Sequence, residues 1–229
     1  MLSIVTITAN NLSGFKKTCE SVELFSENNQ IEWIIVDGGD DVETPQFVAR
    51  IKAPYVNYIR ECDNGIFDAM NKGAKLCKGP WINFMNAGDW FENDFIFKPE
   101  VNTDLIIGKT RYNNIVRPLM NLSDIEKGLM IGSHQAMVYH KKIFDRGYFF
   151  SISPVVYSDF DHLSRLYQSG FYIKLLDVTI ANRSLDGVSS KRLLKNTYSR
   201  YYYIVKNWGI YGFWYAILKS IRNIFSRSE

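Results

Sequence analysis

The sequence predicts an α/β fold in which a mixed, mostly parallel sheet is flanked by helices. Short apolar runs rich in β-branched residues alternate with segments of helical spacing, and most of the apolar runs end in Gly, Asn or Asp. Right-handed crossovers bring the ends of parallel strands to one edge of the sheet. Ligands of open α/β sheets bind outside that edge, so the strand ends are where we look for a site.

The first ninety residues predict four strands and three helices. The strands are expected at 3–8, 31–36, 56–60 and 81–85. The helices are expected at 15–25, 44–51 and 66–76. This order of strand and helix is that of successive βαβ units.

The second half is less regular. Strands are expected at 105–108, 115–118, 135–139, 173–176 and 178–181. Helices are expected at 123–127, capped by Ser123, and at 158–169. We therefore predict one body over 1–190, followed by a helical tail over 191–229. The body divides into a half of about 1–90 and a half of about 91–190.

Charge is distributed unevenly along the 229 residues, whose net charge is +3. From residue 191 onward there are eight basic residues and one acidic residue, a net charge of +7. The other nineteen basic and twenty-three acidic residues give the body −4. An acidic body is a poor candidate for binding nucleic acid. The three widely spaced cysteines argue against a disulfide framework or zinc site and favour a reducing cytosol.

Neither end of the chain predicts a membrane span. The opening run 1–8 has no basic leader, so we interpret it as a buried strand and not as a signal peptide. The longest uncharged run near the other end, 207–218, has twelve residues. A transmembrane helix needs about 20 apolar residues.

Polar residues and glycines follow the predicted strands of the first half: Thr8-Ala9-Asn10, Asp37-Gly38-Gly39, Asp63-Asn64-Gly65 and Asn86-Ala87-Gly88-Asp89. The Asp37 carboxylate could accept a hydrogen bond from the N3–H of uracil, or it could bond its own turn. The Asp89 carboxylate could hold a divalent cation beside a diphosphate, or it could cap a helix at 91–95.

Candidates in the second half are also ambiguous by residue type. Asp159 and Asp161 begin the helix at 158–169, where carboxylates either favour the helix dipole or act as a general base. His134 and Gln135 follow Gly132-Ser133 without a serine–histidine–acid pattern, so both a structural and a catalytic role stay open.

The order of these motifs is more specific than any one of them. Residues 61–73, ECDNGIFDAMNKG, closely resemble the E-x-D-x-G-I-Y-D-A-M-N-K-G stretch of family 2 glycosyltransferases of the GT-A (Rossmann-like) fold. Further matches follow in order from about residue 2 to 188: 3–8, 34–39, 84–89, 133–136 and 158–161. The chain looks most like the small enzymes of colanic-acid, capsule and lipopolysaccharide biosynthesis.

The resemblance implies an inverting glycosyltransferase. Its donor would be a nucleotide-diphosphate sugar, and its acceptor a hydroxyl of a lipid-linked oligosaccharide or polysaccharide precursor. It would use Mn²⁺ or Mg²⁺ and work in the cytoplasm, peripheral at the inner face of the bacterial plasma membrane. The half over 1–90 would then bind the nucleotide, and the half over 91–190 the acceptor.

Residue roles follow from the same resemblance. The nucleotide sugar would contact Thr8, Ala9, Asn10, Asp37, Asp63, Asn71 and Asn86. Among these, Thr8, Asn10 and Asp37 would hold the base, Asp63 the ribose side, and Asn71 would lie near the diphosphate. Asp89 would bind the metal. Asp159 would be the catalytic base, and His134, Gln135 and Asp161 would lie on the acceptor side, with Asp161 the second choice of base.

The chain departs from the family pattern at two positions. Ala87 replaces the first acid of the DXD motif, and Ser158 replaces the glutamate of the ED pair. Two other functions therefore remain open. A sugar nucleotidyltransferase would need a Gly-rich basic loop after the first strand, and 10–14 has no arginine. A non-catalytic sugar- or membrane-binding subunit could keep the fold.

The basic tail carries apolar residues at helical spacing. One predicted face is formed by Leu194, Tyr198, Tyr201, Val205 and Trp208, and another by Phe213, Trp214, Ile217, Ile221 and Ile224. Aromatic, basic helices of this kind lie in the headgroup layer of a membrane. The alternative is that the tail covers the body or a partner subunit.

Overall fold

The computed structural model describes residues 1–152, 157–184, 202, 204–206, 208–214 and 217–218. Within these residues, no helix is both long enough and apolar enough to cross a bilayer.

In the described part of the chain, nine strands form one mixed sheet, in the order β3-β2-β1-β4-β8-β6-β9-β5 with β7 paired to β6. Pairing is parallel among β3, β2, β1 and β4 and between β6 and β9, and antiparallel elsewhere. The strands are β1 (Leu2–Thr8), β2 (Ile31–Asp37), β3 (Val56–Arg60), β4 (Trp81–Phe84), β5 (Trp90–Phe91), β6 (Leu105–Tyr112), β7 (Ile115–Arg117), β8 (Met137–His140) and β9 (Ile173–Arg183).

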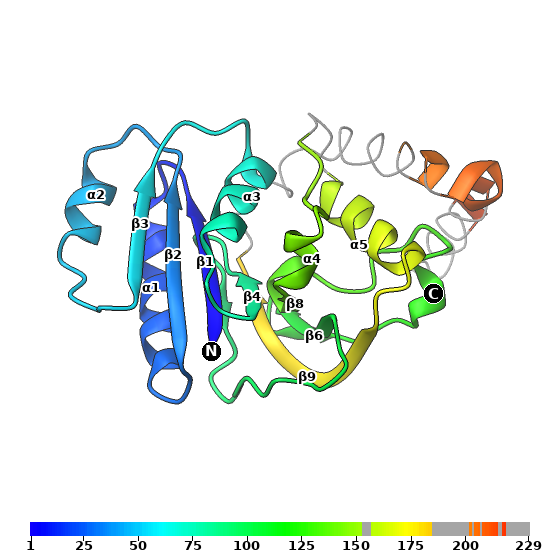
Figure 1. Ribbon diagram of the computed structural model, residues 1–229, viewed down its shortest axis with the longest axis horizontal. Helices are drawn as coiled ribbons and strands as arrows, with labels where there is room; N and C mark the ends of the chain where they lie inside the picture. Colours follow the sequence, from blue (N-terminus) through cyan, green and yellow to red (C-terminus); the bar gives the residue numbers. More distant parts are fainter. Residues whose placement is uncertain (153–156, 185–201, 203, 207, 215–216, 219–229) are drawn as a thin grey trace.

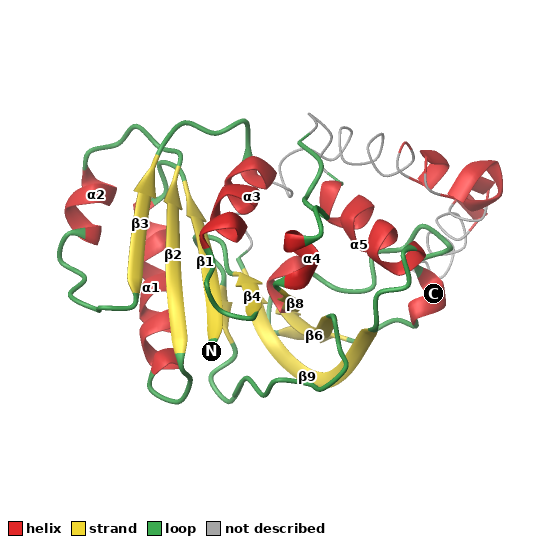
Figure 2. Ribbon diagram, in the orientation of Figure 1, coloured by secondary structure: helices red, strands yellow, loops and turns green. Residues whose placement is uncertain are grey.

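Helices cover both faces of the sheet (Figures 1 and 2). They are α1 (Leu12–Ser26), α2 (Glu43–Val48), α3 (Ile66–Leu76), α4 (Lys142–Asp145) and α5 (Ser158–Gln168), with 3-10 turns η1 (Leu122–Asp124) and η2 (His134–Ala136). This is the α/β fold of mixed sheet and flanking helices that the sequence predicts.

Side chains of β1 and β2 alternate between two hydrophobic layers, because successive residues of a strand point to opposite faces. Val5 and Val36 join the layer that contains α3, α4 and α5. Ile4 and Ile35 join the layer beneath α1. All four are fully buried, so the sheet is a wall between two cores.

The predicted nucleotide and acceptor halves share this one sheet. They meet where β4 pairs with β8, with Trp81 opposite His140. The proposed boundary between body and tail, at residues 190 and 191, lies outside the described residues.

Two local predictions for the second half are wrong. Residues 173–183 form one strand instead of two, because β9 pairs along the length of β6. The helix predicted at 123–127 with Ser123 as its cap is instead the 3-10 turn η1, capped by Asn121 and Asp124. In addition, residues 90–91 form an edge strand where a helix at 91–95 was an alternative, and α4 was not predicted.

His162 of α5 is fully buried in the α3–α5 layer. Its Nε2 lies 2.9 Å from the Tyr148 carbonyl, and its ring centroid lies 4.2 Å from that of Phe150. Burial lowers the pKa of His162 from 6.5 to about 3, with the nearby Arg165 acting in the same direction. This histidine is therefore neutral in the folded protein at physiological pH.

This burial predicts acid destabilisation between about pH 6.5 and 4. Below about pH 6.5 the unfolded chain binds a proton on His162 and the folded chain does not. The free energy of unfolding therefore decreases as the pH is lowered. The slope approaches about 1.4 kcal/mol per pH unit for one such group. Urea unfolding from pH 7 to 5 should show this slope reduced in His162→Gln.

His140 is the necessary comparison, because burial also lowers its pKa, with Lys142 contributing. The contribution of His140 to the pH dependence of stability has the same sign and is present in both the wild type and the His162→Gln variant. The difference between their slopes of unfolding free energy against pH therefore isolates His162. Equal slopes in the wild type and the His162→Gln variant would contradict the prediction.

Candidate functional site

Three strand-end loops meet at the carboxyl edge of the parallel strands. Gly38 N donates to the Thr8 carbonyl at 3.0 Å, and Ala87 N donates to the Ile7 carbonyl at 3.0 Å. Asp63 comes so close to Gly38 that a Cβ built there would lie 2.0 Å from its Oδ2. A side chain at position 38 would have to displace the Asp63 carboxylate, so glycine at this position lets Asp63 reach the edge.

Asp37 lies at this edge but is fully buried. Its Oδ2 accepts a hydrogen bond from the Tyr58 hydroxyl at 2.7 Å, and its Oδ1 accepts one from Gly39 N at 2.9 Å. Burial and the Asp37 carboxylate hold the pKa of Tyr58 above its usual value. Each carboxylate oxygen can accept a second hydrogen bond, so these two donors leave acceptor capacity on Asp37, although its burial restricts access to it.

Asn10 shapes the loop that follows β2. Its backbone is in the left-handed region, with φ of 52°. Its Oδ1 accepts hydrogen bonds from Asp40 N and Asp41 N, and its Nδ2 donates to Asp40 Oδ1. Asn10 thus holds the 38–41 loop beside Thr8, and Ala9 next to it is exposed.

Asn71 is held by the backbone of Phe150. Its Nδ2 donates to the Phe150 carbonyl at 2.8 Å, and its Oδ1 accepts from Phe150 N at 2.9 Å. The residue is 5% exposed. Because both polar atoms bind the backbone of Phe150, this residue ties α3 to the segment before α5, a role that the sequence analysis did not predict.

Asp89 is a buried carboxylate with two donors. Its Oδ2 accepts from Gln135 Nε2 at 2.7 Å, and its Oδ1 accepts from Ser184 N at 2.9 Å. Burial raises the pKa of Asp89, although both hydrogen bonds act in the opposite direction. The residue is 8% exposed, so its charge gains little from water.

Thr18 of α1 fixes the loop that carries Asp89. Its Oγ1 lies 2.7 Å from the Asp89 carbonyl and accepts a hydrogen bond from Gly88 N at 2.9 Å. Sequence analysis missed both Thr18 and Ser184. Thr18 is hidden among the apolar residues of an amphipathic helix, and Ser184 acts through its backbone, which no side-chain pattern reveals.

His134 lies between Asn86 and Asp159. Its Nε2 is 2.9 Å from Asn86 Nδ2, and its Nδ1 is 3.7 Å from Asp159 Oδ2. When the Asn86 amide donates to Nε2, the imidazole carries its proton on Nδ1, facing Asp159. Asp159 Oδ1 accepts from Phe160 N at 2.8 Å, and the side chain is 24% exposed.

Asp161, the second candidate base, has a different environment. It is fully buried, with its Oδ2 2.7 Å from Ser151 Oγ and 2.9 Å from Arg165 Nε. Burial alone would raise the pKa of Asp161, but these bonds and the Lys206 ammonium lower it below its usual value. A buried, ion-paired carboxylate is a poor proton acceptor, so Asp161 is the weaker of the two candidate bases.

The two departures from the family pattern have local explanations. Ser158 is fully buried, and its hydroxyl donates to the Ser151 carbonyl at 2.7 Å. Ala87 is held by its backbone to the end of β1. Neither position presents a polar side chain to the candidate site.

Asp89 and the amide side chains near it offer oxygen atoms of the kind that bind a hard divalent cation. Among the described residues, buried oxygens without a hydrogen-bond partner include Asn86 Oδ1, Gln135 Oε1 and Thr8 Oγ1. Carboxylate and amide oxygens suit Mg²⁺ and Mn²⁺. No group of three or more His, Cys, Asp or Glu side chains forms a metal cluster in this part of the chain. Metal binding would therefore rest on Asp89 with amide oxygens and ligand oxygens.

Comparison with known proteins identifies the family. Residues 3–150 match the model of Glycosyl transferase family 2, and the chain belongs to this family. It is 30% identical over 90 residues to an uncharacterized glycosyltransferase of Mycobacterium tuberculosis, covering 39% of this chain and 34% of that one. It is 29% identical over 158 residues to a PGL/p-HBAD biosynthesis glycosyltransferase of Mycobacterium bovis, covering 63% and 60%.

Solved structures share the fold. S. aureus TarS 1-349 in complex with UDP-GlcNAc superposes with a TM-score of 0.67 at 16% identity, over 90% of this chain and 67% of that one. The mannosyltransferase PcManGT of Pyrobaculum calidifontis, in complex with GDP-Man and Mn²⁺, gives 0.67 at 12% identity, over 90% and 63%. The chain spans about a third to three fifths of the length of the curated relatives it matches.

The geometry predicts that Asp89 is needed for metal-dependent nucleotide binding. With manganese, a nucleoside diphosphate at a hundredfold excess over its dissociation constant should stabilise the wild type by about 2.7 kcal/mol. Asp89→Asn keeps an acceptor for Ser184 N but loses the charge, so thermal unfolding should show little added stabilisation by manganese.

Asp145→Asn is the control, because Asp145 pairs with Lys141 on α4, outside the candidate site. It should keep the full manganese-dependent shift. A full shift in Asp89→Asn would remove Asp89 from the metal site.

Proposed function

We propose that the chain is an inverting glycosyltransferase that moves one sugar from a nucleotide-diphosphate donor to a hydroxyl of a lipid-linked glycan or polysaccharide precursor. The observation that carries the proposal is the turn η2. Its first residue, His134, contacts Asp159, and its second, Gln135, donates to Asp89. One turn thus connects the candidate base with the candidate metal ligand.

The donor assignment is supported by the family and by what related structures bind. TarS was solved with UDP-GlcNAc, and PcManGT with GDP-Man and Mn²⁺. In this chain the nucleoside would occupy the edge formed by Thr8, Asp37 and Asp63. Mn²⁺ or Mg²⁺, held at Asp89 with Asn86 or Gln135 oxygens, would neutralise charge on the departing diphosphate.

The proposed reaction is a direct displacement at the anomeric carbon. The acceptor oxygen forms a bond to that carbon as the bond to the diphosphate oxygen breaks, and the configuration inverts. Asp159 takes the proton of the acceptor hydroxyl on Oδ2, and the nucleoside diphosphate leaves with the electron pair. His134 orients the Asp159 carboxylate, and the Asn86 amide fixes the His134 tautomer.

Two alternative functions make different predictions. In place of a basic glycine-rich loop, Asn11 accepts a hydrogen bond from Gly14 N and caps α1, which weakens the case for a sugar nucleotidyltransferase. A non-catalytic binding subunit would not convert a nucleotide sugar into product. Manganese-dependent release of nucleoside diphosphate from UDP-GlcNAc or GDP-mannose would separate an enzyme from that subunit.

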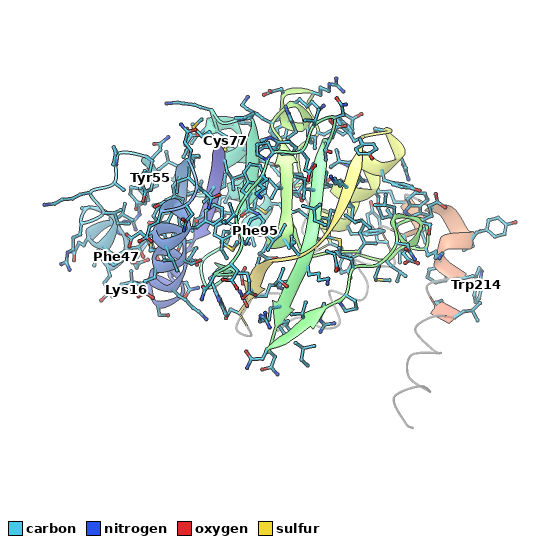
Figure 3. All side chains as sticks on the ribbon, turned by 90° about the horizontal axis from the view of Figure 1, so that it is seen from below. Lys16, Phe47, Tyr55, Cys77, Phe95 and Trp214 are labelled. Atoms are coloured by element: carbon cyan, nitrogen blue, oxygen red, sulfur yellow. The ribbon has the colours of Figure 1, made fainter. Side chains whose placement is uncertain are left out.

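Membrane association through the tail forms the second part of the proposal. We define the outer tail face by its exposed apolar and aromatic residues: Tyr202, Val205, Ile210, Tyr211, Trp214 and Leu218, exposed by 44–87%. Figure 3 shows Trp214 at the end of the molecule opposite Lys16 and Phe47. With the basic residues of 191–229, this face suits an anionic membrane surface, where a lipid-linked acceptor would be found.

The sequence predicts that Val205 and Trp208 share one apolar face of the tail, for which membrane contact was favoured over packing on the body. Val205 is 44% exposed, whereas Ile204, which was not assigned to that face, is fully buried. The remaining residues of that face, at 194, 198 and 201, lie outside the described residues, as do Ile221 and Ile224 of the second face. The described tail both contacts the body and exposes apolar surface.

Asp159→Asn should lower the rate of sugar transfer by about 10²–10⁴-fold, because a positioned base contributes roughly that much. The dissociation constant for nucleoside diphosphate with manganese should stay within about twofold, since Asp159 lies on the acceptor side of η2. Turnover assays and titration of the same preparations measure the two quantities.

Asp161→Asn is the matched variant for this experiment. It removes a buried ion pair, so its main expected effect is a lower melting temperature. If Asp161→Asn, still folded at the assay temperature, loses more activity than Asp159→Asn, the base is misassigned. If neither variant loses activity, the proposed mechanism fails, and His134 is the next residue to replace.

Replacing Tyr211 and Trp214 by Ser should reduce sedimentation with vesicles of anionic phospholipid, because the outer tail face loses most of its aromatic area. Binding of the wild type should also weaken as salt is raised from 50 to 500 mM. Each basic residue near the membrane surface contributes on the order of 1 kcal/mol of attraction to anionic lipid, and salt screens this attraction. Val101→Ser, at a position 85% exposed on the body, is the control and should bind like the wild type. Unchanged sedimentation of the double variant would refute membrane docking by this face.

A further inference from the structure

The inner side of the tail packs against the body beside α5 (Figure 1). Ile204 is fully buried and forms a small apolar cluster with Phe160, the third residue of α5. Met130 and Trp208 pack against the same cluster. Ile204 therefore belongs to the core, although it lies in a segment that the sequence separates from the body.

Gly128 provides the space for Ile204. A Cβ built on Gly128 would lie 2.4 Å from Ile204 Cγ1, and its φ is +71°. Both the close approach and the left-handed backbone favour glycine at this position. The surface of the body is thus shaped to accept this tail side chain.

Lys206, two residues further, adds an ionic contact. Its Nζ lies 3.3 Å from Asp161 Oδ1, on the oxygen opposite the one that Arg165 and Ser151 bind. Asp161 is fully buried, and a buried charge needs partners to be tolerated. Since Arg165 and Ser151 remain without Lys206, its loss should loosen this region before it unfolds the protein.

The tail therefore contacts both residues that follow Asp159. Ile204 packs on Phe160, and Lys206 pairs with Asp161. Asp159 itself is joined to this turn through the hydrogen bond from Phe160 N to its Oδ1. The carboxylate reaches His134 across 3.7 Å, a separation that a small shift of the turn would change.

We propose that the tail positions the first turn of α5 for catalysis, with Lys206 as the positioning residue for Asp159. The proposal rests on the proposed function, in which Asp159 is the base. Undocking of the tail would leave the nucleotide edge intact but move the base away from His134. A full-length chain would then be needed for turnover, even though the tail contributes no group to the reacting atoms.

The first test measures hydrogen exchange in the full chain, with Lys206→Met compared with wild type. Amides of residues 158–163 should exchange at least about fivefold faster in the variant, because local opening of that turn becomes more frequent. Amides of β1 and β2 should be unchanged. Lys206→Arg should restore slow exchange, and Val205→Ala, an exposed neighbour on the same helix, should behave as wild type.

The second test separates positioning from general loss of stability. With manganese and whichever of UDP-GlcNAc or GDP-mannose the wild type turns over, Lys206→Met should lower kcat about tenfold and leave the donor KM unchanged. Ile4→Val leaves a cavity in the layer beneath α1, on the other face of the sheet from α5, so it serves as a variant of lowered stability and should keep kcat.

Unchanged exchange at 158–163 in Lys206→Met would overturn the proposal, and so would an equal loss of kcat in Ile4→Val at matched stability. Exchange does not depend on turnover. If the wild type shows no turnover with any donor, the proposed function fails, and the exchange result still decides whether the tail holds this turn.

Discussion

The arrangement of the candidate site depends on the buried carboxylate of Asp89. Its loop follows β4, and its two hydrogen-bond donors come from η2 and from the residue after β9. A buried carboxylate without such donors would be strongly unfavourable, so these three segments must meet at Asp89. The same turn that supplies Gln135 supplies His134, which couples the position of the candidate base to the position of the candidate metal ligand.

The contrast between Asp159 and Asp161 shows how environment divides the roles of two similar residues. They are two positions apart on one helix, yet Asp161 is completely buried against Arg165, Ser151 and Lys206, while Asp159 keeps partial exposure and faces an imidazole. A base must take a proton, and the ion pairs of Asp161 oppose that. Asp159 is therefore the better candidate for the base, and the ion pairs of Asp161 help to hold the helix that carries both residues.

The sequence was most informative where local pattern and topology agree. The bounds of β3 and α3 were predicted to the residue, because each is a short, uninterrupted pattern bounded by turn residues. The resemblance of residues 61–73 also predicted the family correctly, as the match over 3–150 confirms. Roles that depend on distant partners were harder to predict. The family resemblance implied that Asn71 lies near the diphosphate, and it did not indicate the contact with Phe150, which is 79 residues away in the chain. Nothing in the local spacing around Asn71 identifies that contact.

The tail illustrates the same limit. Its apolar residues lie on most of the circumference of the predicted helix, so spacing alone could not select one inward side. Ile204 is buried because Gly128 leaves room for it, and Lys206, two residues on, reaches the buried charge of Asp161. Tyr211 and Trp214, further along the tail and beyond the left-handed backbone of Gly209, are exposed. The residues that hold the tail on the body are therefore different from those proposed to bind a membrane. A partner that bound Tyr211 and Trp214 only while the tail is docked would add to the docking free energy, because a ligand shifts an equilibrium by its differential affinity for the two states.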